Sequence, residues 1–85
     1  SGMGLSMDDR LILMQYAIVK YDSEGTLKEK LKEAMTPKEI ERAIDTLIGT
    51  QRVRRIGPDV IQNNVSHTGE LPELPEHLKP IVESL

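Results

Sequence analysis

Apolar and polar positions follow a helical spacing over three successive segments of the chain. Between residues 7 and 21 apolar side chains cover most sides of a helix, which is typical of a helix packed against more than one partner. Residues 27–35 and 37–49 each carry one apolar stripe at spacings of three and four. The pattern therefore predicts three helices. A buried β-strand is the alternative for residues 11–19, and the length of the segment favours the helix.

Each predicted helix begins at a hydroxyl residue that is followed, three positions later, by an acid. In such a capping box the hydroxyl accepts from an unpaired backbone N–H, while the acid reaches back to the N–H of the cap. Pro37 follows one of these hydroxyls, at the first helical position, where its missing N–H has no cost. The pairs are Ser6 with Asp9, Thr26 with Glu29, and Thr36 with Glu39.

After residue 49 the pattern changes from helix to strand. Residues 52–56 are basic and β-branched, residues 57–59 have the composition of a turn, and residues 60–62 are apolar enough for a second strand. This predicts a β-hairpin. An earlier strand has room only for a bridge near residues 23–26. The second and third helices are separated by almost nothing, which is typical of a helix-turn-helix.

The remaining residues are more polar and rich in proline. We expect a loop over residues 63–69, an extended segment over residues 71–75, and a short amphipathic helix over residues 78–85, with Pro80 breaking it or starting its last turn. The expected organisation is a flexible N-terminus at residues 1–5, a folded domain at residues 6–64 and an acidic tail at residues 65–85. Ser1-Gly2 before Met3 is typical of a cloning remnant.

Composition and charge narrow the class of protein. A chain of 85 residues is long enough for one core. That core has no Phe or Trp, so it is aliphatic and thin, which favours extra burial in a dimer. The net charge of −3 comes from the residues after 65, which hold one Lys and four Glu, while residues 1–65 are neutral. Local patches rather than the total therefore decide whether a nucleic acid is attracted.

Several functions are disfavoured by what the sequence lacks. The absence of cysteine excludes disulfides and a cysteine-based zinc site, and fits a cytoplasmic protein. There is no glycine-rich phosphate loop and no paired-histidine metal motif, so we expect neither an enzyme nor a cofactor. His67 and His77 are interpreted as ordinary exposed histidines. The longest apolar run is too short to span a membrane, and no signal peptide is expected.

The order of helix, helix, tight turn, helix and basic hairpin resembles the winged-helix superfamily. The stretch TPKEIERAIDTLI at residues 36–48, followed by QRVRRIG at residues 51–57, is similar to its recognition helix and the start of its wing. The implied fold is mainly α, a three-helix bundle with a small β-hairpin and a C-terminal tail. The implied function is DNA binding by a small transcriptional regulator. The alternative is a winged-helix module that binds protein, or a subunit of a larger assembly.

The resemblance also implies which residues would contact double-stranded DNA. The third helix would lie in the major groove, and the hairpin would lie on the phosphate backbone or in the minor groove. Arg42 would read a guanine edge, Lys38 would hold a phosphate, and the arginines of the hairpin would neutralise others. The full set is Thr36, Lys38, Arg42, Thr46, Arg52, Arg54 and Arg55.

Two observations argue against a simple transfer of this function. Glu41 and Asp45 fall on or near the exposed face of the third helix, where they would repel phosphates. Strand alternation puts Arg55 on the side of Val53, so the three arginines of the hairpin need not share one ligand. Their alternative role is to protect the strand edge and to form ion pairs with Asp45 or Asp59.

A winged-helix regulator commonly acts as a dimer, which lets two recognition helices read two half-sites. The sequence offers two apolar surfaces for this, on the first helix and on the tail. The alternative is that the tail covers the first helix within one chain. The candidate dimer residues are Leu11, Ile12, Tyr16, Val19, Leu78, Ile81, Val82 and Leu85.

Overall fold

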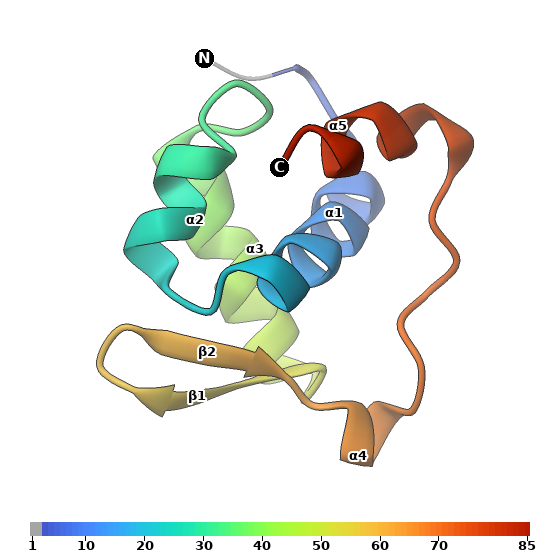
Figure 1. The fold of residues 1–85 in the computed structure, drawn as a ribbon. Helices are drawn as coiled ribbons and strands as arrows, with labels where there is room; N and C mark the ends of the chain where they lie inside the picture. The colour runs from blue at the N-terminus through green and yellow to red at the C-terminus, as the bar shows by residue number, and fades with distance from the viewer. Residues whose placement is uncertain (1–2) are drawn as a thin grey trace.

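A computed structural model describes residues 3–85, except for the side chain of Thr68, and shows helices beside a two-stranded hairpin (Figure 1). Ser1 and Gly2, the expected cloning remnant, lie outside the described residues. The architecture is mainly helical with a small antiparallel hairpin, which is compatible with the winged-helix arrangement. The elements are α1 (Met7–Lys20), α2 (Glu24–Lys30), α3 (Pro37–Gly49), β1 (Val53–Gly57), β2 (Val60–Asn63), α4 (Val65–Thr68), η1 (Glu76–Leu78) and α5 (Lys79–Glu83).

The core is aliphatic, as the composition predicts, and almost every element contributes to it. Three helices, both strands and the tail each bring at least one side chain that is essentially fully buried. The largest of these are Leu13, Met14, Leu27, Leu31, Met35, Ile40, Ile44, Leu47, Val53, Ile61 and Leu78. The third helix and the hairpin are therefore fixed to one common core.

The helix predicted for α1 is confirmed, and the alternative of a buried strand is wrong. The Ser6 hydroxyl accepts from the Asp9 N–H at 3.1 Å, so the hydroxyl half of the predicted capping box forms, whereas the Asp9 carboxylate lies 2.7 Å from the His77 ring. The buried face includes one polar residue, Gln15, whose amide donates to the Asn63 side chain at 3.3 Å. Asn63 in turn donates to the Gln15 backbone oxygen at 2.9 Å, so this pair ties α1 to the end of β2.

The second helix differs from its prediction at both ends. It begins at Glu24 rather than at residue 27, and it ends at Lys30, with turns over residues 31–35. Ser23 is the N-cap, and its hydroxyl accepts from the Thr26 N–H at 3.3 Å. Thr26 therefore lies in the first turn of the helix, and the predicted capping box of Thr26 and Glu29 does not form.

The third helix has the predicted bounds and the predicted cap. The Glu39 N–H donates to the Thr36 hydroxyl at 3.1 Å, and the Thr36 N–H donates to the Glu39 carboxylate at 2.9 Å. The helix extends through Gly49, and the left-handed residue that follows it is Gln51, with φ of 63°. The glycine is thus the last residue of the helix, and Gln51 rather than Gly49 takes the left-handed conformation.

The hairpin forms as predicted, with one irregularity in its ladder. Val53 pairs with Asn63 and Arg55 with Ile61, and the register shifts between Arg55 and Gly57. The expected short first strand is present as a single antiparallel bridge between Ser23 and Val60. This bridge joins the start of α2 to the second strand.

The C-terminal residues pack against α1 in the same chain, as the intrachain alternative predicted (Figure 1). Leu78 is fully buried in the common core. The Tyr16 hydroxyl donates to the Pro72 oxygen at 2.6 Å, and the Lys20 ammonium group donates to the Val82 oxygen at 3.2 Å. Pro80 lies in the first turn of α5, so it starts that helix and does not break it.

Two further details concern the ends of the chain. A short helix, α4, occupies part of the segment that was expected to be a loop. Near the N-terminus the Met3 N–H donates to the Ala34 oxygen at 3.1 Å, and Leu5 packs against the core. No helix within residues 3–85 is long and apolar enough to cross a membrane.

Candidate nucleic-acid interface

The exposed face of α3 is built by the same periodicity that buries its other side. Ile40, Ile44 and Leu47 are fully buried, so the residues between them must point outward. Lys38, Arg42 and Asp45 are all exposed. Spacings of four and three residues place these three side chains in one row along the helix. The row presents two cations and one anion to the surroundings.

The other two acids of α3 each form an ion pair with a basic side chain of the same chain. Glu39 completes the capping box and also pairs with the Arg10 guanidinium group at 2.6 Å. Glu41 pairs with the Lys28 ammonium group at 2.7 Å, and this hydrogen bond lowers the pKa of the Glu41 carboxyl. Asp45 forms no ion pair with any residue that the structure describes. The repulsion expected from Glu41 is therefore offset by Lys28, and Asp45 is the acid that stays uncompensated.

Most of the basic side chains are held by groups of the same chain. Arg10, Lys28, Lys32, Arg55 and Lys79 form ion pairs with acids. Lys20 donates to backbone oxygens of the tail, and Lys30 lies 5.4 Å from the centre of the Tyr21 ring. Within residues 3–85, the basic side chains without such a partner are Lys38, Arg42, Arg52 and Arg54, and all four are exposed. All four are among the residues predicted to contact DNA.

The three arginines of the hairpin do not act as one group. Arg54 lies opposite Gln62 in the ladder and points away from the core side occupied by Val53. Arg55 lies opposite the buried Ile61 and so shares the side of Val53, as alternation predicts. Neither predicted partner, Asp45 or Asp59, forms an ion pair with these arginines in the part of the chain that the structure describes, although the hydrogen bond from Ser23 and, to a smaller extent, the charge of Arg55 lower the pKa of the Asp59 carboxyl.

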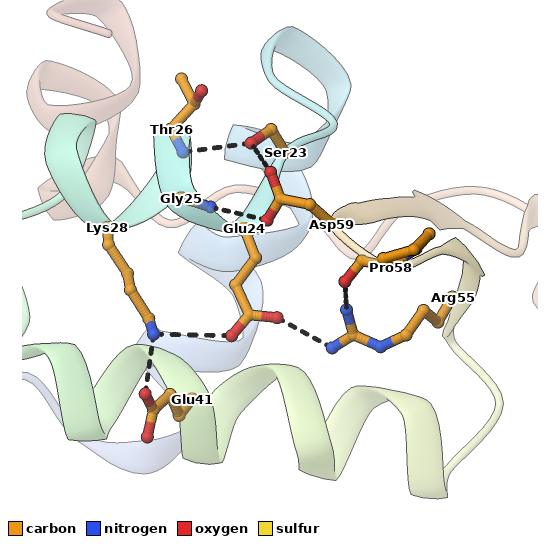
Figure 2. A network of polar contacts seen from close by, with 9 residues as sticks. All are labelled: Ser23, Glu24, Gly25, Thr26, Lys28, Glu41, Arg55, Pro58 and Asp59. Carbon is orange, nitrogen blue, oxygen red and sulfur yellow. Dashed lines mark hydrogen bonds and ion pairs between the residues drawn. The ribbon is translucent and has the colours of Figure 1, made fainter.

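The partner of Arg55 is Glu24, which belongs to α2. The Arg55 guanidinium group bonds the Glu24 carboxylate at 2.8 Å and also donates to the Pro58 oxygen at 3.3 Å. The same carboxylate lies 3.6 Å from the Lys28 ammonium group. A continuous row of alternating charges therefore runs from Glu41 on α3 across α2 to the hairpin (Figure 2). In the sequence only the spacing of four residues between Glu24 and Lys28 indicates part of this row, because Glu41 and Arg55 lie on other elements.

The tip of the hairpin is fixed to the start of α2 by a second carboxylate. Asp59 accepts from the Ser23 hydroxyl and, at 3.1 Å, from the Gly25 N–H (Figure 2). The hydrogen bond from Ser23 is the largest cause, and that from Gly25 the next, of a lowered pKa of the Asp59 carboxyl. For Lys28, the hydrogen bond to Glu41 is the main cause of a raised pKa.

The two threonines predicted to contact DNA have different surroundings. The Thr36 hydroxyl accepts a hydrogen bond inside its own capping box, and the residue is half-buried. Thr46 is exposed and lines a groove of about 380 Å³ between α1 and the end of α3. Leu11 and Ile12 line the same groove, and so does Arg52.

The residues predicted for a dimer interface are mostly covered by the chain itself. Leu78 is fully buried and has no surface to offer a second subunit. Val19 is 66% exposed. The other members, which are half-buried, are Leu11, Ile12, Tyr16, Ile81, Val82 and Leu85.

Comparisons with protein-family models, with curated proteins and with solved structures give no match. Over residues 3–85, no group of three or more His, Asp or Glu side chains is placed to hold a metal ion. The arguments for a function therefore come from the geometry and the charges of the chain itself.

Proposed function

We propose that the chain is a winged-helix DNA-binding domain, acting as a small transcriptional regulator, that holds double-stranded DNA with α3 and the hairpin. The observation that carries this proposal is the distribution of free cations. In the described part of the chain, the basic side chains left without an internal partner are Lys38, Arg42, Arg52 and Arg54, on α3 and at the start of the hairpin. The other seven basic side chains each contact an acid, a backbone oxygen or an aromatic ring of the same chain.

Each of these side chains has a distinct task in the proposed complex. Arg42 lies in the middle of the exposed row of α3, where a guanidinium group can bond both acceptors of a guanine edge in the major groove. Lys38 lies in the first turn and would hold a phosphate beside the groove. Arg52 and Arg54 would contact phosphates from the hairpin. Such contacts position the protein, whereas the contact of Arg42 would contribute sequence preference.

The number of free cations sets the expected salt dependence. Each neutralised phosphate contributes about −0.9 to the slope of the logarithm of the binding constant against the logarithm of salt concentration. Three phosphate contacts, from Lys38, Arg52 and Arg54, give a slope of about −2.7. A fourth contact by Arg42 would bring it to about −3.6. Binding is therefore expected to be modest and to weaken clearly as salt is added.

The test is binding to a mixed-sequence DNA duplex, followed by fluorescence anisotropy at low salt and over a salt series. We expect the double variant Arg52→Ala/Arg54→Ala to bind more weakly and with a shallower salt slope. The matched control is Lys32→Ala/Lys79→Ala, which removes the same charge from side chains that are already paired elsewhere. A wild-type chain that does not bind the duplex at low salt would overturn the proposal.

The second candidate function is binding of another protein. It is favoured by the groove between α1 and α3, whose lining includes the apolar Leu11, Ile12 and Leu47, and by the exposed Asp45. Asp45→Asn separates the two functions by the sign of its effect. Removal of this charge tightens binding to DNA, because an uncompensated acid repels phosphates. It weakens binding to a protein partner that presents a basic group to α3.

A further inference from the structure

Glu24 holds two cations at once in the row of charges between α3 and the hairpin. Its carboxylate lies 2.8 Å from the Arg55 guanidinium group and 3.6 Å from the Lys28 ammonium group (Figure 2). The Glu24 side chain is 21% exposed, against 37% for Arg55 and 31% for Lys28. The three groups are thus accessible to solvent and to a ligand, and the carboxylate is the acceptor that the two cations share.

The position of Glu24 matters because it lies between the two parts of the proposed DNA interface. Arg55 lies on the side of β1 opposite to Arg54 and is bonded to Glu24 at the start of α2, and Lys28 is bonded to Glu41 on α3. A phosphate backbone that runs from α3 past the start of α2 to this side of the hairpin would pass these side chains. A carboxylate and a phosphate are interchangeable acceptors for a guanidinium group, since both accept its paired N–H donors. Glu24 therefore offers Arg55 the kind of acceptor that a phosphate would offer.

The hairpin does not depend on the Glu24 carboxylate for its position. Val53 and Ile61 are buried in the core, which fixes both strands. The Ile61 N–H donates to the Asp22 oxygen at 2.8 Å, and the backbone N–H of Glu24 donates to the Asp59 oxygen at 3.1 Å. An ion pair between partly exposed side chains adds little to such an arrangement. Loss of the carboxylate is therefore expected to release Arg55 without displacing the hairpin, while Lys28 stays paired with Glu41.

We infer that Glu24 is an internal competitor for phosphate, which withholds Arg55 from a nucleic-acid backbone and so limits affinity that is independent of sequence. This inference rests on the proposed function, because it assumes a polyanion as the ligand. It predicts that the wild-type chain binds DNA with fewer cations than the surface carries. It also predicts that removal of one negative group creates an additional phosphate site.

The test compares Glu24→Gln with Glu73→Gln. Both changes raise the net charge by one, but Glu73 is exposed in the tail and pairs with no residue in the described part of the chain. Glu24→Gln is expected to steepen the salt slope for a DNA duplex by about 0.9, corresponding to one new phosphate contact by Arg55. At about 50 mM salt this is roughly a tenfold gain in affinity or more over Glu73→Gln.

Two additional measurements test whether the gain in affinity comes from the Arg55 guanidinium group that Glu24→Gln releases. Arg55→Gln is expected to change duplex binding little in the wild-type chain but to remove most of the gain in the Glu24→Gln background. Inorganic polyphosphate serves as a second probe that needs no duplex. If Glu24→Gln improves binding to polyphosphate while neither protein binds the duplex, the competitor role stands and the proposed DNA function fails.

Two outcomes would overturn the inference itself. If Glu24→Gln equals Glu73→Gln with both probes, the carboxylate withholds nothing. If Glu24→Gln binds both probes more weakly than the wild-type chain, then Glu24 positions the cations for the ligand. Circular dichroism of each variant at the assay temperature separates these results from a loss of folding.

Discussion

The helices α2 and α3 begin in different ways, although the same motif, a threonine with a glutamate three residues later, lies near the start of each. At α3 the cap, its acid and both hydrogen bonds lie within four consecutive residues, Thr36 to Glu39. At α2 the cap is Ser23, and its hydroxyl also donates to Asp59 in the distant hairpin. Asp59 accepts from the Gly25 N–H as well, across 34 positions of sequence. One start is thus local, and the other is made by the tertiary structure.

The difference follows from the residue after the threonine. Pro37 disfavours helical backbone at Thr36, which is accordingly extended with ψ of 161°, so α3 cannot begin earlier. Thr26 is followed by Leu27, which imposes no such limit, and the helix continues back to Glu24. A capping box therefore predicts a helix start reliably when the adjacent residue also blocks extension. Where the adjacent residue does not block extension, hydrogen-bond partners from other elements determine the residue at which the helix begins.

The substitution with the largest expected effect on unfolding free energy in this comparison is Leu27→Ala. Leu27 is the one buried residue within the bounds of α2, whereas α3 buries Ile40, Ala43, Ile44 and Leu47. Removing a buried leucine side chain costs roughly 2–5 kcal/mol of unfolding free energy. We expect this loss in urea unfolding, and we expect the amides of α2 to exchange before those of α3. Leu47→Ala is the matched control, with a similar loss of stability but without selective exchange in α2.

The two threonines give a more direct test of the same comparison. Thr36→Ala removes an N-cap that is formed, and such a change costs about 1 kcal/mol. Thr26→Ala removes a hydroxyl that caps nothing, and we expect its effect on unfolding free energy to stay within about 0.5 kcal/mol. Chemical denaturation of both variants measures the difference. Equal losses would mean that the Thr26 box forms in solution and that α2 begins at residue 27.

The sequence predicts those parts of the fold whose determinants are local. The bounds of α3 follow from Thr36, Pro37 and the apolar stripe, and the hairpin follows from the change of period after residue 49. The bounds of α2 could not be predicted, because Asp59 helps to fix its first turn. The hydrogen bond of the buried Gln15 could not be predicted either, because its partner Asn63 lies 48 positions away in the sequence.

The same limit applies to the candidate site. The sequence picks out the basic residues of α3 and the hairpin, but it cannot say which of them are engaged. Arg54 and Arg55 are neighbours of identical chemistry, yet Arg55 is bonded to Glu24 while Arg54 forms no ion pair with any residue that the structure describes. Glu41 was expected to repel a phosphate, yet it is paired with Lys28. These distinctions depend on which elements meet, which periodicity does not determine.

The end of α3 offers a smaller test, because it reverses the usual placement of glycine. Gly49 lies within the helix, and an added Cβ there would meet nothing within 4 Å. We expect Gly49→Ala to raise the unfolding free energy by roughly 0.5–1 kcal/mol, because glycine loses more freedom than alanine on entering a helix. Thermal unfolding measures the gain. Destabilisation would show that Gly49, and not Gln51, adopts the left-handed conformation in solution.

The smallest expected effect concerns the exposed carboxylate that ties α2 to the hairpin. The pKa of Asp59 is lowered below its ordinary value of 3.8, mainly by the hydrogen bond from Ser23. A group with a depressed pKa stabilises the fold above its unfolded pKa, and this contribution is lost as the pH falls below 3.8 through the folded pKa. The stability difference between the wild-type chain and Asp59→Asn should therefore be constant near neutral pH and shrink in acid.

Glu41, whose pKa is also lowered, is present in both proteins, so its contribution cancels. A difference that stays constant down to about pH 2 would contradict the tertiary origin of the α2 start.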